Sequence, residues 1–189
     1  MSDIVVLPWI GANYKTPRLF SHRTMILGES NYTTPENFTP MLVRDCVDDA
    51  ITGKDPGGFG RFTTKIIRTI FGSDSKVTAE ELWQDVSFLN FVQPSVGTAA
   101  RIRPTTQMWD SSLPVFEETV KTLQPERILV LGIQNWRNVL RLVPHQTHGE
   151  YQANFLVGRI NPLAGYVQHP SSSLKYSEWY PVAQDLLFK

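Results

Sequence analysis

Short runs of aliphatic residues alternate along this chain with longer segments of helical periodicity. The clearest run covers 128–131 and is ended by Gly132. Similar runs cover 24–27, 87–93 and 164–167. Continuous apolar strands that alternate with helices are typical of a mostly parallel sheet with both faces covered. We therefore predict a three-layer α/β/α fold around a central, mostly parallel, four-stranded sheet.

The 189 residues suit a single domain, 1–189, with an ordinary hydrophobic core. The predicted helices cover 33–51, 61–71, 73–86, 112–124, 133–144 and 176–188. The segments 53–60, 94–112 and 145–150 are predicted to be loops by their composition.

Charge and cysteine content exclude several classes of protein. Lysine plus arginine equals aspartate plus glutamate, at 18 each, so any DNA binding must come from a local basic patch. Cys46 is the only cysteine, which excludes a disulfide and a thiolate metal cluster. No apolar run is long enough to span a membrane, and the first residues lack a signal-peptide pattern. We expect a cytoplasmic protein without membrane contact, metal or cofactor.

Polar residues follow three of the predicted strands, where the ligands of open α/β sheets bind. Gly28, Glu29 and Ser30 follow the first, and they offer a sharp turn, a base and a hydroxyl. The alternative is a turn that caps the next helix, with Ser30 or Asn31 as the cap. Asn90 interrupts an apolar run, and its amide is able to read the edge of a base or to be satisfied within the core.

His169 begins a His-Pro-Ser-Ser-Ser segment after the last strand. An imidazole there can donate to a developing anion, and serines and main-chain N–H groups suit phosphate. An ordinary serine-rich turn is the alternative. Arg101 and Arg103 lie in the loop before the fourth predicted helix and are candidates for phosphate contact, or for a solvated loop. His145 and His148 have no spacing that indicates a metal site.

Four segments in this order, LGESNY, FLNFVQP, RILVLGIQNW and VQHPSSS, resemble the motifs of the uracil-DNA glycosylase superfamily. The resemblance covers roughly residues 24–188. It implies a monomeric, DNA-binding enzyme that flips a base out of DNA and hydrolyses its N-glycosidic bond. The iron–sulfur branch is excluded, since one cysteine cannot hold a cluster that needs four.

The resemblance also implies roles for individual residues. Catalytic roles fall to Glu29, Ser30 and His169, with His169 stabilising the departing base. Base-binding roles fall to Gly28, Tyr32, Phe59 and Asn90, with Phe59 stacking on the base and Phe38 and Phe62 as rivals. DNA-binding roles fall to Ser171, Ser172, Ser173, Leu174, Arg101 and Arg103.

Three departures from the motifs bear on activity. Ser30 stands where the most efficient uracil enzymes have a water-positioning aspartate, and Asn31 replaces a proline. Ser173-Leu174-Lys175 follows the late motif, so Leu174 is only a candidate for the wedge that fills the emptied stack. We therefore expect a substrate that is uracil or a modified base, in DNA repair or in defence against modified viral DNA. The alternatives are an inactive DNA-binding module and an unrelated nucleotide-binding α/β protein.

Overall fold

The structure is a computed structural model that describes residues 5–55, 57–98 and 102–189. Within these ranges seven strands form one sheet: β1 (Trp9–Ile10), β2 (Thr24–Asn31), β3 (Val86–Ser95), β4 (Arg127–Leu131), β5 (His145–His148), β6 (Gln152–Phe155) and β7 (Leu163–Val167). The helices are η1 (Pro35–Asn37, a 3-10 turn), α1 (Leu42–Thr52), α2 (Phe59–Phe71), α3 (Ala79–Asp85), α4 (Thr106–Leu123), α5 (Ile133–Leu142) and α6 (Tyr176–Phe188). None of the helices described is long and apolar enough to cross a membrane.

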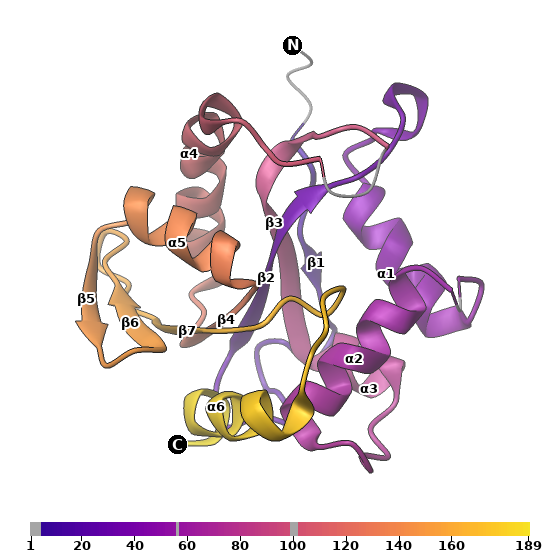
Figure 1. Ribbon diagram of the computed structural model, residues 1–189, viewed down its shortest axis with the longest axis vertical. Helices are drawn as coiled ribbons and strands as arrows, with labels where there is room; N and C mark the ends of the chain where they lie inside the picture. The colour runs from indigo at the N-terminus through magenta and orange to yellow at the C-terminus, as the bar shows by residue number, and fades with distance from the viewer. Residues whose placement is uncertain (1–4, 56, 99–101) are drawn as a thin grey trace.

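The strands run in the order β1-β3-β2-β4-β7-β6-β5 (Figure 1). The four central strands, β3, β2, β4 and β7, are parallel. An antiparallel β1 extends one side, and antiparallel β6 and β5 extend the other. The predicted α/β class is confirmed. The predicted four-stranded sheet is wrong, because three short strands outside the parallel centre bring the mixed sheet to seven.

Helices cover both faces of the sheet. On one face α1, α2, α3 and α6 pack over one hydrophobic core, and on the other α4 and α5 pack over a second (Figure 1). Successive side chains of a strand point to opposite faces, so β4 shares its residues between the cores. Leu129 and Leu131 enter the first core, while Ile128 and Val130 enter the second.

Two predicted loops contain regular structure. The loop predicted over 94–112 ends early, because Thr105 caps α4 by accepting a hydrogen bond from the N–H of Met108 at 3.3 Å. The segment that contains His145 and His148 is strand β5, which pairs with β6. Three of its four residues are exposed, so it carries no apolar alternation that would have indicated a strand.

The order of the parallel strands reverses next to β2. From β2 the chain goes to β3 on one side, and it later places β4 and β7 on the other side. Ligands of open α/β sheets bind in the crevice at such a reversal, outside the carboxyl ends of the strands. Gly28, Glu29 and Gly132, which joins β4 to α5, all lie at this edge.

The carboxylate of Asp85 anchors the segment between β1 and β2. Asp85 is buried, and its Oδ2 accepts hydrogen bonds from the main-chain N–H groups of Arg18 and Leu19. Its Oδ1 accepts from Nδ2 of Asn13 at 3.1 Å. One side chain therefore satisfies three donors of a segment that has little regular structure of its own.

We expect the Asp85→Ala variant to lose about 2–4 kcal/mol of unfolding free energy, because main-chain donors lose a charged acceptor. Urea unfolding followed by circular dichroism measures the loss. The matched control is Asp48→Ala on the exposed side of α1, which is expected to change stability by less than about 0.5 kcal/mol. Equal stability of the two variants would contradict this role of Asp85.

Candidate functional site

The predicted site residues come from strand ends at the carboxyl edge of the parallel sheet. β2 continues to Asn31, so Gly28, Glu29 and Ser30 lie on the strand and not in a loop after it. Side chains of adjacent strand residues point to opposite faces. The strand therefore separates Glu29 from Gly28 and Ser30, which the sequence analysis placed in one turn.

On one face, Gly28 lies directly against Asn90 of β3. The two residues are register partners, and a methyl group on Gly28 would overlap Oδ1 of Asn90 and lie 3.2 Å from the ring of Phe88. Nδ2 of Asn90 donates to Oδ1 of the buried Asn31 at 2.9 Å. Asn31 is held in turn by the main-chain oxygens of Val92 and Gln93. The Asn90 amide is therefore fixed in orientation over a glycine that leaves it room.

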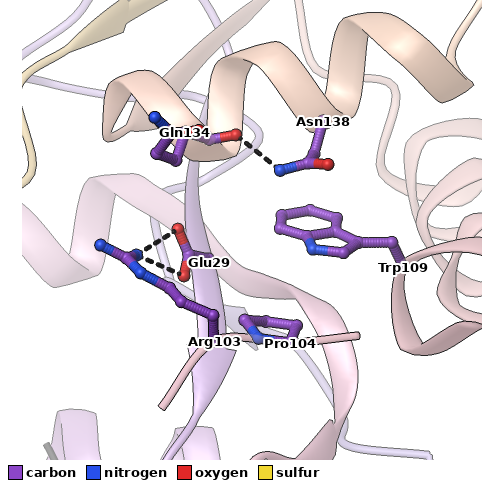
Figure 2. Close-up of a pocket in the computed structure, with 6 residues that line it drawn as sticks. All are labelled: Glu29, Arg103, Pro104, Trp109, Gln134 and Asn138. Atoms are coloured by element: carbon purple, nitrogen blue, oxygen red, sulfur yellow. Dashed lines mark hydrogen bonds and ion pairs between the residues drawn. The ribbon is translucent and has the colours of Figure 1, made fainter. Parts of the chain in front are cut away.

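On the other face, Glu29 forms an ion pair with Arg103. Nη1 of Arg103 lies 3.0 Å from Oε1 and 3.3 Å from Oε2 of Glu29 (Figure 2). The Glu29 side chain is 8% exposed, whereas that of Arg103 is 66% exposed. The carboxylate is thus a buried charge whose described counter-ion comes from an exposed loop.

A pocket of about 300 Å³ lies beside this ion pair. It is lined by Glu29, Arg103, Pro104, Trp109, Gln134 and Asn138 (Figure 2). Gln134 and Asn138 come from the first turns of α5, just after β4, so the pocket opens at the reversal of strand order. Its lining combines an indole with carboxylate, guanidinium and amide groups, which suits a polar ring or substituent.

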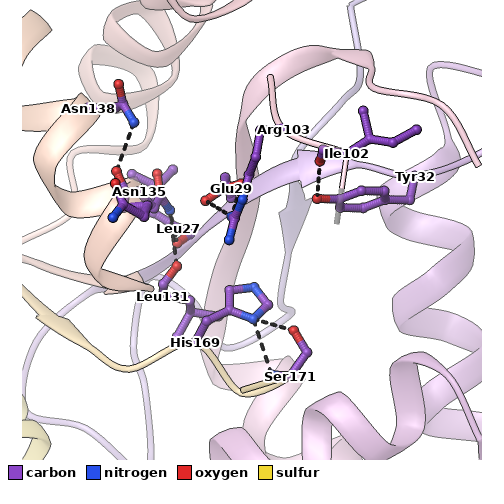
Figure 3. A network of polar contacts seen from close by, with 11 residues as sticks. Leu27, Glu29, Tyr32, Ile102, Arg103, Leu131, Asn135, Asn138, His169 and Ser171 are labelled. Atoms are coloured by element: carbon purple, nitrogen blue, oxygen red, sulfur yellow. Dashed lines mark hydrogen bonds and ion pairs between the residues drawn. The ribbon is translucent and has the colours of Figure 1, made fainter. Parts of the chain in front are cut away.

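His169 lies two residues after β7, with Ser171 folded against its ring (Figure 3). The Nδ1 atom accepts a hydrogen bond from the main-chain N–H of Ser171 at 3.1 Å and lies 2.6 Å from the Ser171 hydroxyl. An N–H group can only donate, so Nδ1 carries no proton and the neutral ring carries it on Nε2. Burial, with the positive charges of Arg103 and Lys65, lowers the pKa of His169 to about 4. At neutral pH His169 is therefore a neutral hydrogen-bond donor through Nε2.

Two further residues fix the position of His169. Gly132, at the end of β4, has φ +105, and a methyl group there would lie 3.2 Å from Cβ of His169. Lys65 of α2 donates from Nζ to the main-chain oxygen of Pro170 at 2.7 Å. From the sequence, Gly132 is predictable only as the end of a strand, and Lys65 is not predictable as a site residue, since nothing in its helix indicates that it reaches another loop.

Asn135 joins the carboxyl ends of β2 and β4. Its side chain is fully buried, and Nδ2 donates to the main-chain oxygens of Leu27 at 3.2 Å and Leu131 at 3.4 Å (Figure 3). These two residues immediately precede Gly28 and Gly132. The sequence signal for Asn135 was a polar residue within the amphipathic segment after the clearest strand, which by itself does not indicate a site.

The three aromatic residues proposed for base stacking lie in different surroundings. Phe59 packs into an aromatic cluster, with its ring centroid 5.6 Å from both Trp83 and Phe88. Phe62 is the ring beside the imidazole, at 5.8 Å from that of His169. Phe38 is buried in the first core. Of the three candidates, Phe62 is the one whose ring contacts a predicted catalytic residue.

Other predicted residues have identifiable partners or positions. Tyr32 is 45% exposed, and its hydroxyl donates to the main-chain oxygen of Ile102 at 3.0 Å, so it supports the loop that carries Arg103. Ser30 is buried, and its Oγ has no hydrogen-bond partner among the described residues. Arg101 lies outside the described residues.

The loop after His169 presents the predicted DNA-binding serines to solvent. Ser171, Ser172 and Ser173 are exposed, and Leu174 is half-buried. The hydroxyl of Ser172 donates to the main-chain oxygen of His169 at 2.6 Å, as does its N–H at 2.9 Å. These contacts form a tight turn that leaves the serine edge facing outward.

The glycine-rich segment before α2 has a local structural cause. Asp55 accepts hydrogen bonds from the N–H groups of Gly58 and Phe59 at 2.7 and 2.8 Å. A methyl group on Gly58 or Gly60 would overlap Asp55. These glycines therefore allow Asp55 to approach the start of α2.

In the described ranges no three histidine, cysteine, aspartate or glutamate residues are grouped so as to hold a metal ion. Cys46 is half-buried, and burial together with the carboxylates of Asp49, Asp45 and Asp55 raises the pKa of its thiol. A raised pKa disfavours the thiolate, which is the nucleophilic form.

No protein-family model matches the chain, and no curated protein matches it either. The function must therefore be inferred from the residues and their geometry.

We expect nuclear magnetic resonance titration of His169 to give a pKa of about 4 in the intact protein. Lys65→Gln should raise this pKa, because it removes a positive charge that disfavours the imidazolium. Lys121→Gln, on the exposed side of α4, is the control and should leave it unchanged. An unperturbed pKa near 6.5 in the intact protein would contradict the environment described for His169.

The same shift makes stability depend on pH. Between pH 6.5 and about 4 the unfolded chain binds a proton at His169 that the folded chain does not bind. The unfolding free energy should therefore fall as pH is lowered through this window. His169→Asn should lose this part of the pH dependence, and an unchanged dependence in the variant would assign it to other groups.

Gly28→Ala should displace the Asn90 side chain and cost about 1–3 kcal/mol of stability through overpacking. The measurements are urea unfolding and the nuclear magnetic resonance signals of the Asn90 amide. Gly57→Ala is the control, since a methyl group there meets side-chain atoms only at ordinary contact distances of 3.8 Å and beyond. An unshifted Asn90 amide in Gly28→Ala would show that the two residues are not in contact.

Proposed function

We propose that this protein is a DNA glycosylase, which draws one nucleotide out of the DNA stack and hydrolyses the bond between base and deoxyribose. The product is free base and an abasic site. The observation that carries the proposal is the neutral His169, which has its proton on Nε2 at the carboxyl edge of the parallel sheet.

Departure of the base needs a hydrogen-bond donor that stabilises the negative charge developing on it. As the bond between C1′ and the base nitrogen breaks, its electron pair goes to the base, and the sugar gains oxocarbenium character. A neutral imidazole N–H stabilises the base anion by hydrogen bonding without first losing solvation as a charged group. The Ser171 N–H holds this tautomer, and Gly132 allows the ring to sit close to the end of β4.

Asn90 supplies a means of reading the base. Its amide has one acceptor and two donor positions, and one donor is engaged by Asn31. The remaining donor and the acceptor match the paired acceptor and donor of an amide-like pyrimidine edge. Phe62, beside His169, offers the aromatic surface for stacking that Phe59 was predicted to provide.

Glu29 is the carboxylate available to orient the attacking water and to accept its proton. Arg103 keeps it compensated in its buried position and occupies only part of its lone-pair capacity. Glu29 would accept a hydrogen bond from the attacking water, whose oxygen bonds to C1′. The proton released by water passes to the carboxylate and ends on the departed base.

The substrate is uracil or a modified base. Ser30 stands in the position of the water-positioning aspartate, and its buried hydroxyl has no described partner. The pocket of about 300 Å³ beside Glu29 offers space and polar groups next to the sheet edge for a base that carries a substituent. Such an enzyme would act in DNA repair, or in defence against DNA that carries modified bases.

Base release is the direct test. DNA duplexes and single strands that carry uracil, hypoxanthine or bulkier modified bases are incubated with the protein, and abasic sites are read as alkali-labile breaks. One base should be released, and Glu29→Gln and His169→Ala should each lower the rate by roughly a hundredfold or more. Because the pKa of His169 is about 4, the rate should not fall through its protonation until pH approaches that value.

The matched control is Glu118→Gln, an exposed carboxylate on α4, which should release base at the unaltered rate. Near-normal release by both site variants would refute these roles. DNA binding without release of any base would instead identify a non-catalytic module in which the Arg103–Glu29 ion pair keeps the carboxylate engaged.

A further inference from the structure

Helix α2 carries positive charge on one face and no negative charge at all. Its charged residues are Arg61, Lys65 and Arg68. Spacings of four and three residues place all three on one side of a helix, within one sector of its surface. The opposite side, which includes Ile66, Ile67 and Ile70, is buried in the first core.

This charge is a local departure in a chain with no net charge. Exposed helix faces normally mix both signs, as α4 does with its Lys121–Glu117 pair at 3.5 Å. Among the residues that the structure describes, neither Arg61 nor Arg68 forms a salt bridge. The charge of Arg61 contributes to lowering the pKa of Asp55, but the Asp55 oxygens accept hydrogen bonds from the N–H groups of Gly58 and Phe59.

The cationic face of α2 is continuous with the candidate active site. Lys65 lies in the middle of this face and donates to the main-chain oxygen of Pro170. Its charge also helps to lower the pKa of His169. The loop from β7 to α6, which holds the exposed serines, therefore lies along α2 (Figure 1). Arg61 and Arg68 flank this contact, about 10 Å apart along the helix axis.

We propose that Arg61, Lys65 and Arg68 form a track for the phosphates of the DNA strand that carries the flipped nucleotide, an inference that rests on the proposed function for its choice of partner. About 10 Å of helix matches about three nucleotide steps at 3.4 Å along one strand. A strand whose nucleotide lies at His169 then continues across α2. Contacts of this kind position the strand and carry no sequence information.

The test is the salt dependence of DNA binding. The probe is an unmodified 30-base-pair duplex, and the variant is Arg61→Gln with Arg68→Gln. Lys65 stays, because it holds the Pro170 loop. Loss of two phosphate contacts should make the plot of the logarithm of the DNA-binding constant against log[salt] shallower, with a slope smaller in magnitude by about 1.8. Glutamine is a good helix former, and circular dichroism checks that α2 is intact.

Two control variants separate a track from a general effect of charge. Lys15→Gln with Arg159→Gln also removes two positive charges, but from exposed positions outside α2. This pair should leave the slope unaltered. Arg61→Lys with Arg68→Lys keeps the charge and should keep the slope. Equal changes in the two glutamine pairs, an unaltered slope in the α2 pair, or no DNA binding by the intact protein would overturn the track.

Failure of the track and failure of the proposed function give different results. Base release from a uracil-containing form of the same duplex, with an unaltered slope in the α2 pair, would refute the track alone. A shallower slope confined to that pair, without release of any base from the panel described above, would refute the glycosylase and leave the phosphate track in place.

Discussion

The buried amide of Asn135 is the interaction on which the arrangement of the site depends. By donating to the main-chain oxygens of Leu27 and Leu131, it ties together two strands at the place where their order reverses and their hydrogen-bonded ladder ends. Gly28 and Gly132 follow directly. Gly28 lies too close to Asn90 for a side chain, and Gly132 has a positive φ and lies close to His169. A buried, hydrogen-bonded amide is well suited to this task because it is costly to displace.

The alternation of β2 divides the chemistry between two faces. Gly28 and Asn90 meet on the face of the first core, whereas Glu29 opens toward the pocket between α4 and α5. Arg103 links the two, since it pairs with Glu29 and its charge also reaches His169. A ligand that contacts both Asn90 and Glu29 must therefore reach both faces of β2, and not lie within one turn as the linear motif suggested.

Local sequence patterns predicted the parallel centre of the fold because aliphatic runs such as 128–131 have few alternatives once they are buried. They missed β5 and β6. The residues of β5, 145–148, are polar and mostly exposed, and they form a strand through pairing with β6. The proximity of Ser171 to Nδ1 of His169 follows from a short motif, but the lowered pKa that keeps the ring neutral comes first from burial in the fold and then from Arg103 and Lys65, over 60 residues away. Phe59 was preferred to Phe62 on spacing, and only three-dimensional packing distinguishes rings three residues apart on a helix.

The short outer strands also determine what the sheet offers to other molecules. An unpaired strand edge is a template on which a second chain can add, and long, flat edges lead to aggregation. Here the parallel strands are enclosed by β1, of two residues, and by β5, of four residues with mostly exposed side chains. A second copy of the chain that paired along β1 or β5 would find only two residues on the first and four on the second, too few for an extended intermolecular ladder.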